Sequence, residues 1–298
     1  MEPHWDDLKV FLAVAREESL SGAGRLLKLD PATVGRRIAR LESALDVELF
    51  VKSPQGYALT GPGELLLGQG EQAEQAIRGA ADVLAGPGER MSGQIRIGAP
   101  DGCANYLLPQ ICAAIAGENP DLEIQVVALP RVVNLSRREA DMAIGVSAPT
   151  ARQLLVEKIT DYRLHLVAAR DYLLRAAPIE AVADLRGHRM IGYIPDMIFD
   201  AELDYLGEFG VERVALASNS VPVQLRLASQ GAGLCVAHDF ALPSHPPLRK
   251  VLHSRVSLTR SFYLVRHRGD QRSARLNRFA AALCEALRAE VARLESLT

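Results

Sequence analysis

The chain has 298 residues, of which 48% are hydrophobic and 23% are charged, and its formal net charge is −2. This composition excludes a mainly disordered chain, and the length predicts about two domains, with room for a smaller appendage. No apolar run approaches the roughly 18 residues of a membrane-spanning helix, and the acidic start, Met1–Asp7, does not resemble a signal peptide. The sequence therefore predicts a cytoplasmic protein with no membrane partner.

The first 60 residues predict three short helices. Leu8, Phe11, Leu12 and Ala15 follow the spacing of one apolar helix face, and we expect Ser21 to cap a second short helix. Asp30 followed by Pro31 is a strong helix start, so a third helix is predicted over residues 32–41.

The third helix has an apolar face and a basic face. Val34, Ile38 and Leu41 fall together on a helical wheel and should face the core. Five basic residues and one acid lie between positions 25 and 40, although residues 1–60 as a whole are almost neutral. Such a surface fits the major groove of double-stranded DNA, and a merely solvent-exposed face is the alternative.

A hairpin is predicted over residues 48–60, with its turn at residues 53–56. It forms a plausible wing next to the basic helix. Lys52 and Ser53 would then be placed to meet DNA phosphates.

At this point the sequence strongly resembles the LysR-type transcriptional regulators. The N-terminal pattern of that family is carried by Phe11-Leu12-Ala13-Val14-Ala15, Ser19-Leu20-Ser21, Ala23, Leu26-Leu27, Thr33-Val34, Arg36, Ile38, Leu41-Glu42, Leu45, Leu49-Phe50 and Leu59-Thr60. Looser landmarks of its sensor domain are Ile95–Pro100, Tyr106–Pro109, Asp141–Ile144 and Gly231–Leu234. The chain departs from the family at Gly22 and Gly24, where helix formers are common, and at Gly35 and Gly102, where a small hydroxyl residue is common.

The resemblance implies a winged helix-turn-helix that binds double-stranded DNA. Arg36 is the first candidate for a base contact, because a guanidinium can bond a guanine edge at two points. Arg37 is expected to contact phosphate or to pack its stem. The full predicted DNA-binding set is Ser21, Pro31, Ala32, Thr33, Arg36, Arg37, Arg40, Lys52 and Ser53.

A long helix is predicted over residues 61–86, with Thr60 able to cap its start. Apolar and small residues recur along it at heptad spacing and form a seam, which consists of Leu66, Gly70, Ala73, Ile77, Ala80 and Leu84. A helix lying against its own domain is the alternative. In the resembling family this helix pairs two subunits, which implies a homodimer or a homotetramer.

From residue 92 onward, short apolar strands alternate with amphipathic helices, which is typical of an α/β fold. Strands are expected at residues 94–99, 122–128 and 141–146, and helices at 104–117 and 273–288. The chain should cross into a second lobe near Tyr162 and return near Leu264, an arrangement that resembles periplasmic binding proteins.

Ligands of open α/β sheets lie beyond the carboxyl ends of strands, so the candidate effector residues follow strands or precede a helix near Pro222. They are Asp101, Gly102, Cys103, Ser147, Tyr193, Ser218 and Asn219. Helix starts could hold a carboxylate or phosphate, whereas Asp101 would favour a ligand that carries an amine.

No catalytic motif, cofactor or metal site is predicted. Gly231-Ala232-Gly233 lacks the third glycine of a dinucleotide loop and stands between a helix and a strand, the wrong order. The histidines are scattered, with His238, His245 and His253 expected in loops. Cys103, Cys112, Cys235 and Cys284 form no C-x-x-C pair, which favours buried thiols and leaves redox sensing as the alternative.

Together these features predict an α/β protein with an N-terminal winged helix-turn-helix, a linker helix and a two-lobed, periplasmic-binding-protein-like effector domain. The expected boundaries are 1–60, 61–88 and 92–298, with lobe I at 92–161 plus 266–298 and lobe II at 162–265. The predicted function is sequence-specific transcriptional regulation controlled by an unknown small-molecule effector. The alternative is a small-molecule binding protein without DNA-dependent regulation.

Overall fold

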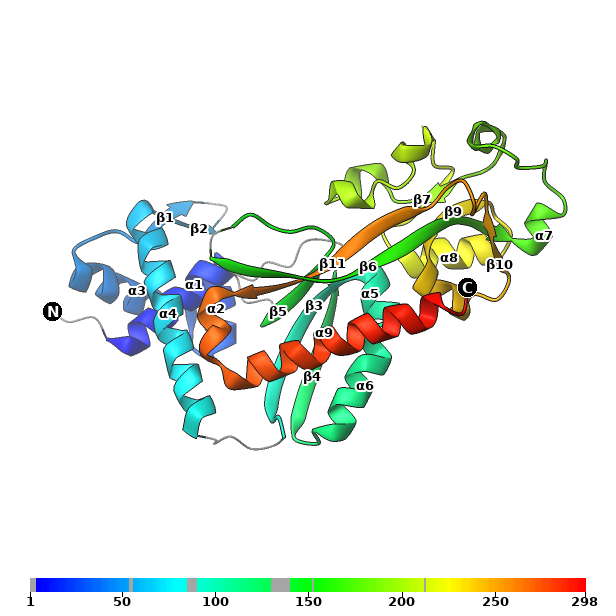
Figure 1. Ribbon diagram of the computed structural model, residues 1–298. Helices are drawn as coiled ribbons and strands as arrows, with labels where there is room; N and C mark the ends of the chain where they lie inside the picture. The colour runs from blue at the N-terminus through cyan, green and yellow to red at the C-terminus, as the bar shows by residue number, and fades with distance from the viewer. Residues whose placement is uncertain (1–3, 54–55, 85–89, 130–139, 152, 212) are drawn as a thin grey trace. The chain divides into compact units, whose positions relative to one another are not determined.

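The computed structural model describes residues 4–53, 56–84, 90–129, 140–151, 153–211 and 213–298. The chain forms two compact units, Met1–Pro87 and Gly88–Thr298. Figure 1 labels most of the helices and strands of both units.

The N-terminal unit contains three short helices, a hairpin and a long helix. They are α1 (Trp5–Glu17), α2 (Leu20–Leu27), α3 (Pro31–Leu45), β1 (Phe50–Ser53), β2 (Gly56–Leu59) and α4 (Gly61–Leu84). The core of this unit includes Phe11, Val34, Ile38 and Leu41, so the predicted apolar face of the third helix is confirmed. That helix extends four residues beyond the predicted end at Leu41, because Leu45 also packs against the core.

Ser19, and not Ser21, caps the second helix. The Ser19 hydroxyl accepts the Gly22 N–H at 3.3 Å, and Ser21 is exposed as the second residue of α2. The prediction of a Ser21 cap is therefore wrong. Glu18 adopts a left-handed conformation that ends α1, so the next extended residue, Ser19, becomes the cap.

The C-terminal unit is built around two long antiparallel strands, β6 (Leu154–Ala169) and β11 (Leu258–His267). They run side by side in Figure 1 through the middle of the unit. Their register shifts between Phe262 and Tyr263, which marks a β-bulge in the ladder.

One group of elements, the first lobe, lies at the N-terminal end of β6. Here the sheet continues from β11 to β5, β3 and β4. The lobe consists of β3 (Gly93–Pro100), α5 (Asp101–Tyr106), α6 (Leu108–Glu118), β4 (Leu122–Leu129), β5 (Met142–Gly145) and α9 (Ala274–Glu295).

A second group, the second lobe, lies at the other end of β6, where β9 and β10 pair with it. Its elements are α7 (Arg170–Leu173), β7 (Ile191–Gly192), β8 (Leu216–Ala217), α8 (Val221–Ser229), β9 (Leu234–His238) and β10 (Leu248–Val251). Short 3-10 helices connect them at Val182–Gly187, Pro195–Met197, Ala201–Leu203, Gly207–Phe209 and Asp239–Ser244, and a further one, Arg268–Arg272, precedes α9.

The helix predicted over residues 104–117 is two helices. The chain breaks at Leu107, whose side chain is fully buried, and Pro109 stands at the start of α6. Proline removes an N–H and clashes with the preceding turn, which explains why the helix is interrupted here. Since α5 already begins at Asp101, the predicted ligand residues Asp101, Gly102 and Cys103 form its first turn.

Candidate functional site

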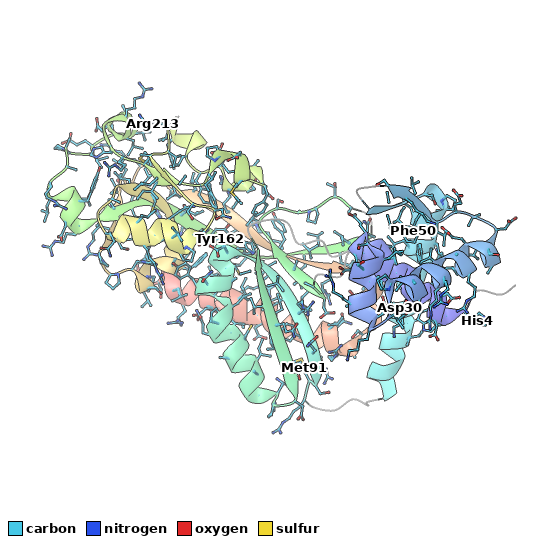
Figure 2. The ribbon with its side chains drawn as sticks, turned by 180° about the vertical axis from the view of Figure 1, so that it is seen from behind. His4, Asp30, Phe50, Met91, Tyr162 and Arg213 are labelled. Atoms are coloured by element: carbon cyan, nitrogen blue, oxygen red, sulfur yellow. The ribbon has the colours of Figure 1, made fainter. Side chains whose placement is uncertain are left out.

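The start of α3 is organised by Asp30, which is labelled in Figure 2. One carboxylate oxygen of Asp30 accepts the Thr33 N–H at 2.8 Å, and the other accepts the Thr33 hydroxyl at 2.5 Å. Both hydrogen bonds lower the pKa of Asp30 below its ordinary value. The predicted start at Asp30 and Pro31 is thereby confirmed.

Arg36 extends this network. Its Nη2 donates to the Thr33 hydroxyl at 2.9 Å, and its side chain is exposed. Pro31 and Ala32 are exposed as well, while Thr33 and Arg37 are partly buried. The first turns of α3 thus present a guanidinium that is hydrogen-bonded to Thr33, which Asp30 holds in turn.

Arg40 departs from the expectation of an outward DNA-facing side chain. Its Nε donates to Asp7 Oδ2 at 2.6 Å, and its Nη2 donates to the other carboxylate oxygen. The Asp7 side chain is 1% exposed and that of Arg40 is 51% exposed. A buried carboxylate needs a partner, so Arg40 ties α3 to α1 and its guanidinium is already engaged. Residues 33 positions apart form this pair, which sequence spacing does not reveal.

The hairpin presents the two predicted wing residues. Lys52 stands opposite Tyr57 in the strand register, and both Lys52 and Ser53 are exposed. The Ser53 hydroxyl donates to the Gly56 carbonyl at 3.4 Å. Residues 54 and 55 of the predicted turn lie outside the described residues.

The long helix α4 uses part of its predicted seam within its own unit. Thr60 caps it as expected, since its hydroxyl accepts the Gly63 N–H at 3.0 Å. Gly70 lies against α1, where a Cβ would come within 3.0 Å of the Leu12 side chain, and Leu66 packs on the same core. Ile77 is 53% exposed and Leu65, outside the seam, is 77% exposed. The side chains of Ala80 and Leu84, and residues 85–88 of the predicted linker, lie outside the described residues.

In the C-terminal unit, Asp101 connects the two lobes. Its Oδ2 accepts the Val221 N–H, the first of α8, at 2.7 Å, and its Oδ1 accepts the Asn105 amide at 2.9 Å. Gly102 is buried beside them, where a Cβ would lie 3.3 Å from the His238 ring. Asp101 therefore faces the start of α8, the place where an anionic ligand would bind.

Cys103 does not face an opening between the lobes. It is buried in the apolar core, and burial raises the pKa of its thiol well above the ordinary value. The expectation that Cys103 contacts a ligand is not supported by this position. It stands in the first turn of α5, whose inner face packs against the sheet.

Ser147 forms a second connection between the lobes. Its hydroxyl donates to Asp200 Oδ2 at 2.5 Å. Tyr193, Ser218 and Asn219 are partly buried, and the Ser218 hydroxyl accepts the Ser220 N–H at 3.1 Å. Asp101 thus contacts the second lobe at the start of α8, and Ser147 contacts it at Asp200. These are two separate contacts between the lobes.

The sequence did not reveal a buried aromatic cluster around Tyr162. Figure 2 labels Tyr162, which stacks on Phe262 with ring centroids 4.2 Å apart and lies 5.5 Å from the His238 ring. The Tyr205 hydroxyl lies 3.4 Å from His238 Nε2. Burial lowers the pKa of His238 to about 4, so its ring is neutral at pH 7. The expectation that His238 stands in a loop is wrong, because it ends the buried strand β9.

Two general features hold for the described part of the chain. No group of three or more His, Cys, Asp or Glu side chains comes together there as a set of metal ligands. Within the same residues, every helix is too short or too polar to cross a bilayer.

Comparison with known proteins assigns the two units. Residues 5–64 match the bacterial regulatory helix-turn-helix protein, lysR family, and residues 88–288 match the LysR substrate binding domain. The chain belongs to the LysR family. It is a DNA-binding transcriptional regulator with an effector-binding domain, as the sequence predicted.

Named LysR-type relatives match most of the chain. The regulator PtxR of Pseudomonas aeruginosa is 28% identical over 239 residues, which are 78% of this chain and 76% of PtxR. The regulator GltR of Bacillus subtilis is 26% identical and covers 86% of each chain.

The fold of this LysR-family chain is also similar to solved structures. A full-length OxyR variant from Pseudomonas aeruginosa is 17% identical, covers 97% of this chain and 95% of its own, and gives a TM-score of 0.73. This likeness supports the predicted fold class of a helix-turn-helix unit joined to an α/β effector domain.

Proposed function

We propose that α3 reads the operator through Arg36, and that the first turn of α3 and the hairpin hold the phosphates around it. The observation that carries this assignment is the Asp30–Thr33–Arg36 network, which fixes an exposed guanidinium near the start of a capped helix. Guanidinium groups form bidentate bonds to guanine O6 and N7, and helix starts favour phosphate. The proposed contact set is Ser21, Pro31, Ala32, Thr33, Arg36, Arg37, Lys52 and Ser53.

Arg40 is left out of this set because Asp7 engages it. Its contribution to DNA binding would be indirect, through the placement of α3 on α1. Arg37 is assigned to phosphate because it is partly buried beside the core face.

A gel-shift titration on operator and random duplexes tests the assignment. Arg36→Ala should reduce the preference for operator over random DNA by about 5- to 150-fold, which corresponds to ~1–3 kcal/mol of base discrimination. Arg36→Lys keeps the charge but not the planar fork, so it should lose most of that preference. Lys9→Ala, an exposed lysine on α1, is the matched control. Equal losses on both duplexes for Arg36→Ala would assign Arg36 to phosphate instead.

We further propose a homodimer or homotetramer that pairs through α4. The support is the exposed apolar side chains of Leu65 and Ile77 on a helix of 24 residues. Two recognition helices would then meet successive major grooves about 34 Å apart. Sedimentation of Leu65→Glu and Ile77→Glu variants should show smaller assemblies, with circular dichroism confirming that each variant is folded.

The domain boundaries of the proposal are 1–60, 61–88 and 92–298, with the small-molecule effector held by the two lobes of the last segment. Effector binding would change how these lobes are arranged and thereby alter DNA binding, a coupling that must be reciprocal. We also propose that the protein works in the cytoplasm, where bacterial DNA lies, and without catalysis of its own. The named relatives are regulators, which supports this assignment.

A further inference from the structure

The second lobe contains two adjoining cavities that no predicted site residue except Tyr193 reaches. The larger is a hollow open to the surface, with a volume of about 660 Å³, and the smaller, which is more enclosed, has a volume of about 280 Å³. They share Pro195, Ile198, Asp204 and Gly207, so they border each other. The larger volume is in the range of ligand pockets, and the smaller lies just below that range.

The charged side chains that line these cavities are carboxylates. Asp200 and Asp204 line the larger cavity, and Asp204 also lines the smaller one. Among the described residues that line either cavity, none is basic. Asp204 accepts the Gly207 N–H at 3.2 Å, and Asp200 accepts the Ser147 hydroxyl and the Glu202 N–H. Neutral donors leave the negative charge of both carboxylates in place, so the cavities favour a cation.

The absence of a side chain at Gly207 leaves the space beside the Asp204 carboxylate open. A Cβ at Gly207 would lie 2.7 Å from Asp204 Oδ2, and Gly207 lines both cavities. The nearby cation, Arg260, pairs with Glu202 at 2.8 Å and lies 6.0 Å from the centre of the Tyr205 ring. The charge of Arg260 is therefore balanced by Glu202, and Glu202 lines neither cavity.

The usual place for an anion is already filled. Asp101 of the first lobe accepts the Val221 N–H at the start of α8, and Pro222 has no N–H to offer. An anionic ligand there would meet a carboxylate and lose the helix N–H that Asp101 holds. This position of Asp101 favours the amine-bearing ligand over the carboxylate or phosphate.

Most residues that line the smaller cavity are apolar or aromatic, and Gln224 and Asp204 add polar groups to its wall. Tyr193 and Tyr205 line it with ring centroids 6.0 Å apart in an edge-on arrangement. Burial raises the pKa of both hydroxyls, so the phenols are neutral. Since Arg260 already lies over the Tyr205 ring, Tyr193 is the ring that can attract a further cation. The apolar lining includes Ile191, Ile198, Leu203, Leu206, Val211 and Val214.

We propose that the effector of this protein is a small organic amine with an apolar body. Its ammonium group binds Asp204 and Asp200, and its body lies against Tyr193, Tyr205 and the aliphatic wall. The inference rests on the proposed function that the lobes bind an effector, and it adds the charge and the apolar character of that effector. Since Asp200 also holds Ser147 of the first lobe, an amine at Asp200 would compete with a contact between the lobes.

Charge-matched probes test the inference on the full-length protein. Calorimetric titrations would compare 2-phenylethylamine with phenylacetate and 2-phenylethanol, and hexylamine with hexanoate and 1-hexanol. We expect at least one amine to bind about tenfold or more tightly than its anionic and neutral counterparts. Asp204→Asn and Asp200→Asn should each weaken that binding by roughly 10- to 100-fold, the range of a charge-assisted hydrogen bond.

Asp196→Asn is the matched control, because Asp196 is exposed on the same segment but lines neither cavity. It should leave amine binding unchanged. A preference for the carboxylates, the absence of amine binding in both series, or amine binding that survives both Asp200→Asn and Asp204→Asn overturns the inference. Circular dichroism of each variant establishes that the loss is not one of folding.

Footprinting on operator DNA separates this inference from the proposed function. A protein that protects a discrete DNA tract but binds neither amine remains a regulator, and only the effector class is wrong. A protein that protects no tract contradicts the proposed function, whatever the amines do. The supporting result is a footprint that the bound amine alters in the wild type and not in Asp204→Asn.

Discussion

Two glycines of the helix-turn-helix should respond in opposite directions to the same substitution. A Cβ at Gly24 in α2 would lie 2.6 Å from the Leu29 carbonyl oxygen, whereas a Cβ at Gly35 in α3 would meet only the Leu20 side chain, at 3.4 Å. The Leu29 N–H also bonds the Gly24 carbonyl at 2.9 Å, so the turn between α2 and α3 cannot move away. We expect Gly35→Ala to stabilise the N-terminal unit and Gly24→Ala to destabilise it.

The magnitudes follow from two competing effects. Replacing glycine by alanine inside a helix gains up to ~1 kcal/mol in helix propensity. Gly35→Ala should keep most of that gain, while relief of the overlap at Gly24 costs ~1–3 kcal/mol and reverses it. The two variants should therefore differ by about 2 kcal/mol in the free energy of unfolding.

The single tryptophan makes the measurement specific to this unit. Trp5 is the only tryptophan of the chain and stands at the start of α1, so its fluorescence during urea titration reports the N-terminal unit. With a slope of ~1–1.5 kcal/mol per M, the two unfolding midpoints should differ by more than ~1 M. Equal midpoints for the two variants, or a higher midpoint for Gly24→Ala, would refute the argument from the Leu29 carbonyl.

Three other predictions follow from buried groups. Arg40→Ala should destabilise the N-terminal unit because it strands the buried Asp7 carboxylate, and a second substitution, Asp7→Asn, should recover part of the loss; urea titration of the single and double variants measures both. Burial lowers the pKa of His238 to about 4. As the pH falls below ~6.5, His238 takes up a proton in the unfolded chain before it does so in the folded protein. The free energy of unfolding should therefore drop between pH 6.5 and 4, by at most ~3 kcal/mol. Thermal melts followed by circular dichroism should show a smaller drop for His238→Gln than for the wild type over that window. Iodoacetamide should modify the partly exposed Cys112 of the native protein before the buried Cys103 and Cys235. Burial raises the pKa of all three thiols, so the order of modification depends on how far the reagent can reach each one. Peptide mapping at successive times would show this order.

Local patterns predicted the N-terminal unit well. The spacing of Val34, Ile38 and Leu41 gave the buried face of α3, and the Asp30-Pro31 pair gave its start. These features depend on neighbours within a few residues along the chain. Ser19 and Ser21 are both good capping residues, so the choice between them depended on the backbone at Glu18, which composition does not report.

Contacts between distant segments could not be predicted in the same way. The Asp7–Arg40 pair joins two helices, and the cluster of Tyr162, Tyr205 and His238 joins three separate parts of the chain. Each residue alone has an ordinary local pattern. The cavity residues Asp200 and Asp204 lie among short 3-10 turns, where no hydrophobic period marks the inward side chains.

The shared strands have a consequence for how this chain can be divided. Because β6 and β11 belong to both lobes, cutting between the lobes would sever both strands of their shared ladder and expose four strand ends. Neither half should then be expressible as an independent fragment. The β-bulge at Phe262 and Tyr263 interrupts the hydrogen bonds between β6 and β11. A rotation of one lobe against the other would therefore twist the two strands mainly at this bulge. Two spectroscopic labels, one on each side of that position, should then change their separation when the halves rotate. Two labels within the same half should keep their separation.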